Sequence, residues 1–261
     1  MSIEHKKGTR DAVLVTGGTT GIGLAISLRF IAEGKEVYTV SRRGEDNVEE
    51  LDRVVKERGL ARPHVLKADV SDRARLQEIA AELENNDVVL RTIIGSAGIN
   101  VRELFLDVSD EAIRSMIEIN LYGLISTFQV FGSAALKQPG SRFIAISSLN
   151  AIHGMQLRAP YSGTKAGVAG FVRALAVEWG PLGATVNSIA PGIIETPLTR
   201  GYMTQFPERR AAGIEHTPAR RLGSVEDIAH AAVFLASKGA SFVNGHTLVV
   251  DGGLSVGSSW W

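Results

Sequence analysis

Short apolar runs alternate with amphipathic stretches along most of the chain. An apolar run at 12–18 precedes a helical pattern at 23–34, and further runs at 36–40 and 64–70 flank a polar helical stretch. Apolar positions at helical spacing indicate helices, whereas continuous apolar runs indicate strands covered on both faces. This alternation predicts repeated βαβ units and a parallel sheet.

The second half of the chain continues the same pattern. Further strands are predicted at Val88–Gly95, Arg142–Ser147, Ala184–Ile189 and Thr247–Val250. Further helices are predicted at 71–84 with Ser71 as N-cap, 109–136, 161–179 and 225–236. The sequence therefore predicts an α/β fold: a single doubly wound, Rossmann-type domain over 1–261, with a seven-stranded, mostly parallel sheet flanked by helices on both faces.

Residues 195–221 interrupt this regular pattern. The segment is rich in Pro, Arg and Thr and shows no periodicity. Because irregular stretches of this length in compact domains are usually functional, we expect a substrate-binding lid that contains a short helix. Residues 254–261 are expected to form a C-terminal tail.

Composition narrows the classes of function. Lys plus Arg and Asp plus Glu each total 28, so the zero net charge supplies no overall attraction to nucleic acid or an anionic membrane. The absence of Cys excludes disulfides, thiolate chemistry and iron–sulfur centres, and the six His residues lack metal-ligand spacing, so no metal is expected. No apolar run suits a membrane span or a signal peptide, and we expect a cytoplasmic protein.

A glycine-rich turn follows the first predicted strand. Glycine lets the backbone approach a pyrophosphate closely, and the N-terminus of the next helix offers free N–H groups. A glycine turn alone is weak evidence, because strand-to-helix turns often need glycine for geometry. The strand before it and the helix after it favour a dinucleotide site. Its expected contacts are Gly17, Thr19, Thr20, Gly21 and Ile22.

The end of the next predicted strand bears on the choice of dinucleotide. In such folds an acid at this position binds the ribose 2′-OH, whereas an arginine accommodates a 2′-phosphate. Here the sequence reads Ser41-Arg42-Arg43. Ordinary surface charge is the alternative interpretation. The missing acid and the paired guanidinium groups favour NADP(H) over NAD(H).

Tyr161 and Lys165 lie four residues apart on a predicted helix, and therefore on the same face. A neighbouring cation lowers the pKa of a phenol, so Tyr161 could exchange a proton with a carbonyl or alcohol oxygen. An ordinary amphipathic surface is the alternative. The helix also carries Gly163, Gly167 and Gly170, each costing about 1 kcal/mol relative to Ala, which predicts close packing there.

Ser147 and Ser148 end a buried strand, at the edge where open α/β sheets bind ligands. Strand-end serines often satisfy only local backbone groups. The nearby Tyr–Lys pair favours a role for one of them in the active site.

Together, motifs in a fixed order over nearly the whole chain resemble the short-chain dehydrogenase/reductase family, in the branch of the 3-oxoacyl-ACP and tropinone reductases. The motifs are the glycine turn, Ala68-Asp69-Val70, Gly95-Ser96-Ala97-Gly98, Asn120, Ser148, Tyr161 with Lys165, Pro191-Gly192, Asn244-Gly245 and Asp251-Gly252-Gly253. One position departs from the family pattern: Ser96 stands where asparagine is usual, and we expect slightly altered support of the central strand.

The resemblance implies an NADP(H)-dependent oxidoreductase that reduces a small-molecule ketone to a secondary alcohol, or performs the reverse. It implies the catalytic residues Asn120, Ser148, Tyr161 and Lys165, with Ser147 as the alternative serine. Beyond the turn and the arginines, it implies cofactor contacts from Asp69, Val70, Ser96, Ala97, Gly98, Tyr161, Lys165, Pro191, Gly192, Ile194 and Thr196. It also implies a homotetramer, with a dimer as the alternative, in which Trp260 and Trp261 are buried near an interface.

Two other functions fit the same fold: an epimerase or dehydratase, and a catalytically silent NADP(H)-binding scaffold. The epimerases and dehydratases usually carry a different glycine spacing and a longer C-terminal region, and silent relatives commonly lose the Tyr or the Lys. His153, Arg158 and Arg102 could recognise a carboxylate, but we expect solvated loop residues at all three positions.

Overall fold

A computed structural model describes residues 10–257, in which seven strands form one sheet. The strands are β1 (Arg10–Thr16), β2 (Glu36–Ser41), β3 (His64–Lys67), β4 (Val88–Gly95), β5 (Arg142–Ile146), β6 (Thr185–Pro191) and β7 (Thr247–Val250). Their order is β3-β2-β1-β4-β5-β6-β7, and every described pair is parallel. The predicted doubly wound α/β fold is confirmed, with a sheet that is entirely rather than mostly parallel.

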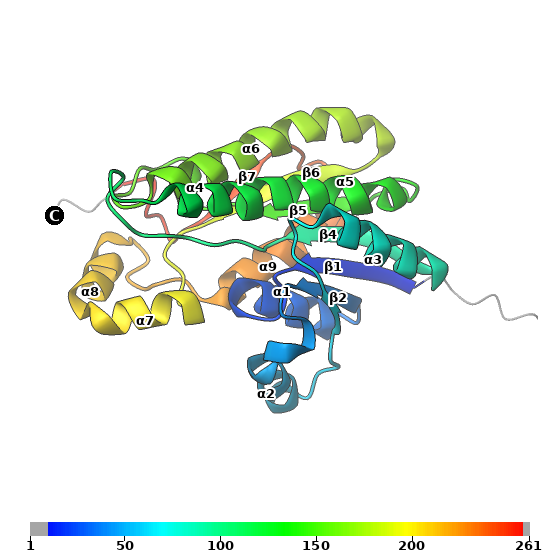
Figure 1. The fold of residues 1–261 in the computed structure, drawn as a ribbon, viewed down its shortest axis with the longest axis horizontal. Helices are drawn as coiled ribbons and strands as arrows, with labels where there is room; N and C mark the ends of the chain where they lie inside the picture. Colours follow the sequence, from blue (N-terminus) through cyan, green and yellow to red (C-terminus); the bar gives the residue numbers. More distant parts are fainter. Residues whose placement is uncertain (1–9, 258–261) are drawn as a thin grey trace, which may run out of the picture.

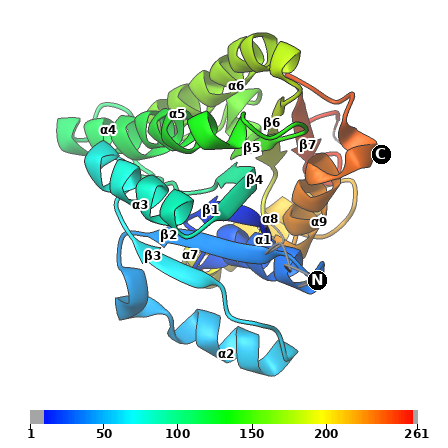
Figure 2. The same ribbon diagram turned by 90° about the vertical axis from the view of Figure 1, so that its right-hand side faces the viewer.

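Helices cover both faces of the sheet (Figures 1 and 2). One face carries α1 (Gly21–Ala32), α2 (Glu49–Arg58) and α9 (Val225–Ala236). The other carries α3 (Arg73–Asn85), α4 (Asp110–Ile117), α5 (Gly123–Ala135) and α6 (Ala159–Trp179). Two further helices, α7 (Pro197–Gln205) and α8 (Pro207–His216), stand apart from both layers (Figure 1).

Apolar side chains from the two faces of the sheet build two separate cores. Phe128 of α5 packs edge-on against Phe143 of β5, with ring centroids 5.4 Å apart. On the opposite face, Ile144 of β5 belongs to a cluster with Ile26 of α1 and Ile228 of α9. Because β5 is buried on both faces, its sequence is continuously apolar rather than alternating.

The strand order reverses between β1 and β4, which opens a crevice at the carboxyl edge of the sheet. The two strands end side by side, with Thr16 opposite Gly95. The Thr16 hydroxyl accepts hydrogen bonds from the backbone N–H groups of Ser96 and Ala97, at 3.1 and 3.2 Å. The first residues after both strands are thereby held next to each other.

The segment predicted as a helix at 109–136 is helical from Asp110 to Ala135, but it is not α-helical throughout. A π-helical turn at Glu118–Tyr122 separates α4 from α5 and contains Asn120. The prediction of Ser71 as an N-cap was also wrong: Asp72 caps α3 by accepting from the N–H of Arg75, while Ser71 donates to Asp69.

The 195–221 segment folds into α7 and α8, not one short helix. Pro197 and Pro207 each stand at the first position of their helix, where a missing N–H costs no hydrogen bond. Within residues 10–257, no helix is long and apolar enough to cross a membrane. Trp260 and Trp261 lie outside the described residues.

The prediction of close packing at three glycines of α6 holds only in part. An added Cβ at Gly167 would lie 3.2 Å from the side chain of Leu121. At Gly163 it would meet no described atom within 4 Å, and at Gly170 only the Arg173 guanidinium at 3.8 Å. Most of the glycine content of this helix is therefore not required by the described contacts.

Candidate active site

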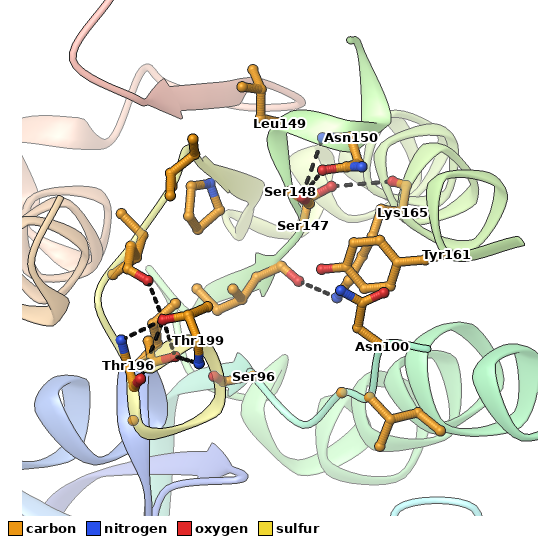
Figure 3. A pocket seen from close by; sticks show the side chains of 18 of the residues that line it. Ser96, Asn100, Ser147, Ser148, Leu149, Asn150, Tyr161, Lys165, Thr196 and Thr199 are labelled. Atoms are coloured by element: carbon orange, nitrogen blue, oxygen red, sulfur yellow. Dashed lines mark hydrogen bonds between the residues drawn. The ribbon is translucent and has the colours of Figure 1, made fainter. Parts of the chain in front are cut away.

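A cavity of about 310 Å³ lies at the carboxyl edge of the sheet. Segments far apart in sequence line it, as Figure 3 shows: Ser148, Tyr161 and Lys165 lie on one side, with Ser96, Thr196 and Thr199 across from them. The predicted site residues that line it are Gly17, Thr20, Gly21, Ile22, Ser96, Ala97, Gly98, Ser147, Ser148, Tyr161, Lys165, Pro191, Gly192, Ile194 and Thr196.

The glycine turn forms one end of this cavity. Gly17 has a φ of +67°, and an added Cβ would lie 3.0 Å from the Cα of Ala97. A Cβ on Gly23 would lie 2.2 Å from the carbonyl oxygen of Gly17. The first turn of α1 has neither a side-chain cap nor an acidic residue, so its N–H groups can bind phosphate oxygens. The residues present fit a dinucleotide pyrophosphate.

The end of β2 lies beside this turn but outside the cavity. The Thr19 hydroxyl donates to the Ser41 hydroxyl at 3.3 Å, which connects the turn to the predicted 2′-phosphate position. Arg42 and Arg43 are exposed. A second hollow contains Arg42 together with Asp69. Arg42, which is predicted to bind the 2′-phosphate, and Asp69, which is predicted to contact the adenine, therefore line the same hollow.

The two candidate serines have different partners. The Ser147 hydroxyl donates to the carbonyl oxygen of Lys165 at 3.1 Å, so it connects β5 to α6. The Ser148 hydroxyl donates to Asn150 Oδ1 at 3.2 Å and accepts from the Asn150 N–H at 3.1 Å. Asn150, which sequence reasoning missed, also lines the cavity and orients Ser148.

Asn120 does not line the cavity but fixes the segment that does. Its side-chain amide accepts from the N–H of Ile99 at 2.8 Å and donates to the carbonyl of Ile99 at 2.9 Å. It also donates to the Thr164 hydroxyl at 3.2 Å, which links the π-helical turn to α6. A Cβ at Gly98 would lie 3.2 Å from Asn120 Oδ1, so glycine there permits the close approach of the Asn120 side chain.

Lys165 is buried at the wall of the cavity. Its ammonium donates to the carbonyl of Ile146 at 2.8 Å, and burial lowers its pKa to about 8. The ammonium lies 5.8 Å from the centre of the Tyr161 ring. At neutral pH the side chain remains mostly charged.

The expected lowering of the Tyr161 pKa by Lys165 is wrong for this structure. Burial raises the pKa of the phenol, and the Ser148 hydroxyl and the charges of Arg158 and Arg102 only partly oppose that rise. Desolvation of the phenolate exceeds the effect of the nearby cations. Tyr161 is therefore protonated at neutral pH.

Arg102 and Arg158 were expected to be solvated loop residues, and this expectation is also wrong. Both are partly buried and line the cavity, whereas His153 is exposed and lies outside it. Sequence reasoning also missed Asn100, whose buried Oδ1 has no hydrogen-bond partner among the described residues. The position of the two arginines near the predicted active site was the sequence signal that could have placed them in its lining.

Within residues 10–257, no group of three or more His, Asp or Glu side chains could hold a metal. The glycine turn lies at the switch point of a parallel sheet, and the cavity beside it is lined by Ser148, Tyr161 and Lys165. These features define the class of the protein, an oxidoreductase on a dinucleotide-binding fold.

Comparisons with known proteins identify the family within that class. The profile of a family described as Enoyl-(Acyl carrier protein) reductase matches residues 17–255. A 3-oxoacyl-(acyl-carrier-protein) reductase of Thermotoga maritima is 32% identical over 248 residues, which cover 93% of this chain and 97% of that protein. A galactitol 2-dehydrogenase of Cereibacter sphaeroides is 34% identical over 244 residues, or 93% and 94% of the two chains.

A solved structure agrees with these relatives. The gluconate 5-dehydrogenase of Burkholderia cenocepacia, crystallised with NADP and tartrate, superimposes with a TM-score of 0.87 at 28% identity, covering 95% of this chain and 96% of that one. The chain belongs to the short-chain dehydrogenase/reductase family and is similar to its 3-oxoacyl-ACP reductases. It is an oxidoreductase acting on CH–OH groups.

Proposed function

We propose that this protein is an NADP(H)-dependent ketoreductase, which reduces a small-molecule ketone to a secondary alcohol or performs the reverse reaction. The convergence of Ser148, Tyr161 and Lys165 in the cavity that the glycine turn also lines carries this proposal. The NADP in the Burkholderia relative and the pair of arginines after Ser41 support the choice of cofactor.

The glycine turn and the N-terminus of α1 would hold the pyrophosphate of the cofactor, and Ser41, Arg42 and Arg43 its 2′-phosphate. Asp69 and Val70 would contact the adenine, and Ser96, Ala97 and Gly98 would line its path. Pro191, Gly192, Ile194 and Thr196 would contact the nicotinamide end, with Lys165 on its ribose. When bound, NADPH supplies the hydride.

The chain's own residues would supply the proton and the orientation. Ser148, fixed by Asn150, orients the substrate carbonyl oxygen toward Tyr161. Tyr161 holds its proton because burial raises its pKa, and it donates that proton to the oxygen. Lys165 then helps to return a proton to the phenolate that remains, with Asn120 fixing the neighbouring backbone.

Two alternatives stay open on the same fold: an epimerase or dehydratase, and a silent NADP(H)-binding scaffold. A screen of NADPH oxidation over a panel of ketones, with a parallel NADH arm, separates them from a ketoreductase. Ketone-dependent oxidation of NADPH, with NADH much less effective, is the expected result. Tight NADPH binding without turnover of any ketone would favour the scaffold.

The domain organisation, the cellular location and the oligomeric state of the protein are also proposals. We propose a single domain over 1–261 with a substrate lid at 195–221, a C-terminal tail at 254–261, and a cytoplasmic location. A homotetramer, or otherwise a dimer, is proposed from family resemblance, and sedimentation of the purified protein tests it. Sedimentation of a variant that lacks the last four residues then tests whether Trp260 and Trp261 lie at a subunit interface.

A further inference from the structure

The charged residues in the described lining of the cavity are all cationic. Its charged residues are Arg102, Arg158 and Lys165, and no Asp or Glu is among the described residues that line it. Lys165 donates to the backbone at the end of β5 and has a role in the proposed mechanism. The two arginines have no role in it.

Neither arginine has a charge partner among residues 10–257. No described acid lies within ion-pair distance of Arg102 or Arg158, and no described group accepts a hydrogen bond from them. Arginines of the adjoining 195–221 segment differ, because Arg210 pairs with Glu195 and Arg221 with Asp227. No nitrogen of Arg102 or Arg158 is among the described buried atoms that lack a partner, so their N–H donors are open to the cavity, where a bound anion can accept hydrogen bonds from them.

The two guanidinium groups lie close enough to repel each other. Burial, and next the charge of Arg102, lower the pKa of Arg158. Both charges also reach the Tyr161 phenol, where they act against the rise in its pKa. The two cations and the proton donor therefore share one electrostatic environment.

Arg102 is held in place by the 195–221 segment. Its guanidinium carbon lies 4.3 Å from the centre of the Tyr202 ring in α7. Stacking covers a face of the guanidinium and leaves its N–H donors free to bind a planar anion. Arg158 immediately precedes α6, three residues before Tyr161, and is positioned by the same helix.

We propose that Arg102 and Arg158 together bind a carboxylate of the substrate, so that the carbonyl compound is a keto acid rather than a neutral ketone. This inference rests on the proposed function, since it names the substrate class of the same site. A carboxylate placed on the arginine pair would set its carbonyl group toward Ser148 and Tyr161. Two planar guanidinium forks match a carboxylate well, because each can form paired hydrogen bonds with it.

A turnover experiment compares keto acids of four to eight carbons with their neutral methyl esters, using NADPH and the full chain. Keto acids are expected to have the higher kcat/KM. Arg102→Gln and Arg158→Gln are each expected to lower it by about 10- to 100-fold for the acids while leaving the esters within about threefold. Arg200→Gln, which alters an exposed arginine of α7 outside the cavity lining, is the matched control and should change neither.

A binding experiment without turnover separates this inference from the proposed function. Calorimetry on the NADPH-loaded protein measures succinate, dimethyl succinate and inorganic phosphate. We expect succinate to bind most tightly and to bind weakly after Arg158→Gln, with partial recovery in Arg158→Lys and unchanged melting temperatures. Succinate binding without reduction of any ketone would contradict only the proposed function.

Three results would overturn the carboxylate site itself. The first is an acid-to-ester ratio that neither arginine substitution changes. The second is equal binding of succinate and its dimethyl ester. The third is tighter binding of phosphate than of succinate, which would indicate a phosphorylated substrate.

Discussion

The Lys165 ammonium lies 2.8 Å from the carbonyl oxygen of Ile146, and the side chain is buried at the cavity wall with no described carboxylate in an ion pair with it. One backbone acceptor does not replace the hydration of a charged amine. The fold therefore holds this cation at the expense of its own stability, as expected for a group retained for chemistry.

This cost predicts the pH dependence of stability. The folded pKa of Lys165 is about 8, below the ordinary 10.5, so the penalty applies fully below pH 8 and disappears as the pH rises to 10.5. Lys165→Met should then raise the free energy of unfolding by roughly 2 kcal/mol at pH 7, and by progressively less from pH 8 to 10.5. Urea unfolding of both proteins at pH 7 and 10 measures the difference. An equal difference at the two pH values would contradict the prediction.

Ser147 and Ser148 offer a matched pair, because they are adjacent but bond to different partners. Ser148→Ala should reduce kcat/KM by about 100-fold or more, since it removes the group proposed to orient the carbonyl oxygen. Ser147→Ala removes only a bond between β5 and α6, and should lower the free energy of unfolding by about 1 kcal/mol with a much smaller effect on turnover. Steady-state kinetics and urea unfolding on both variants test this; a larger kinetic loss in Ser147→Ala would reverse the assignment.

The proposed contacts to the 2′-phosphate lie at the end of β2. Ser41→Asp places a negative charge where the 2′-phosphate is expected, and should weaken NADPH binding by about 10- to 100-fold while NADH binding improves or stays constant. Fluorescence titration with both cofactors measures the change. Arg53→Gln, at an exposed residue of α2 paired with Glu57, is the control. An unchanged NADPH-to-NADH ratio in Ser41→Asp would contradict the NADP(H) assignment.

The glycine turn makes a steric prediction. Gly23→Ala would bring a methyl group to 2.2 Å from the backbone oxygen of Gly17, so the turn must shift and NADPH affinity should fall by at least about tenfold. Gly170→Ala, with only a flexible arginine near the added methyl, should leave NADPH affinity unchanged. Equal NADPH affinities in the two variants, measured by calorimetry, would show that the turn does not bind the pyrophosphate.

The fold was predictable because its determinants are local in the sequence. Buried parallel strands are continuously apolar, and Tyr161 and Lys165 lie one helical turn apart, so both features appear directly in the chain. The π-helical turn could not be predicted in this way. It places Asn120 against Ile99, 21 residues earlier, and only tertiary packing brings them together.

Burial explains the errors in the site. The sign of the Tyr161 pKa shift depends on desolvation by the whole cavity, which the spacing of two residues does not reveal. Arg158 was expected to be solvated because it lies in a predicted loop, yet the fold turns it into the cavity that Arg102 also lines. Local spacing predicted which groups meet, but not the environment that surrounds them.

The central claim, that Tyr161 protonates a ketone reduced by NADPH, is tested most directly by one comparison. Ketone-dependent NADPH oxidation is measured for the unaltered protein and for Tyr161→Phe, with NADPH affinity determined on both. The account predicts that Tyr161→Phe loses at least about 1,000-fold in kcat, because a phenyl ring has no proton to donate, while NADPH affinity stays within about threefold. Turnover by Tyr161→Phe within about tenfold of the unaltered protein would contradict it.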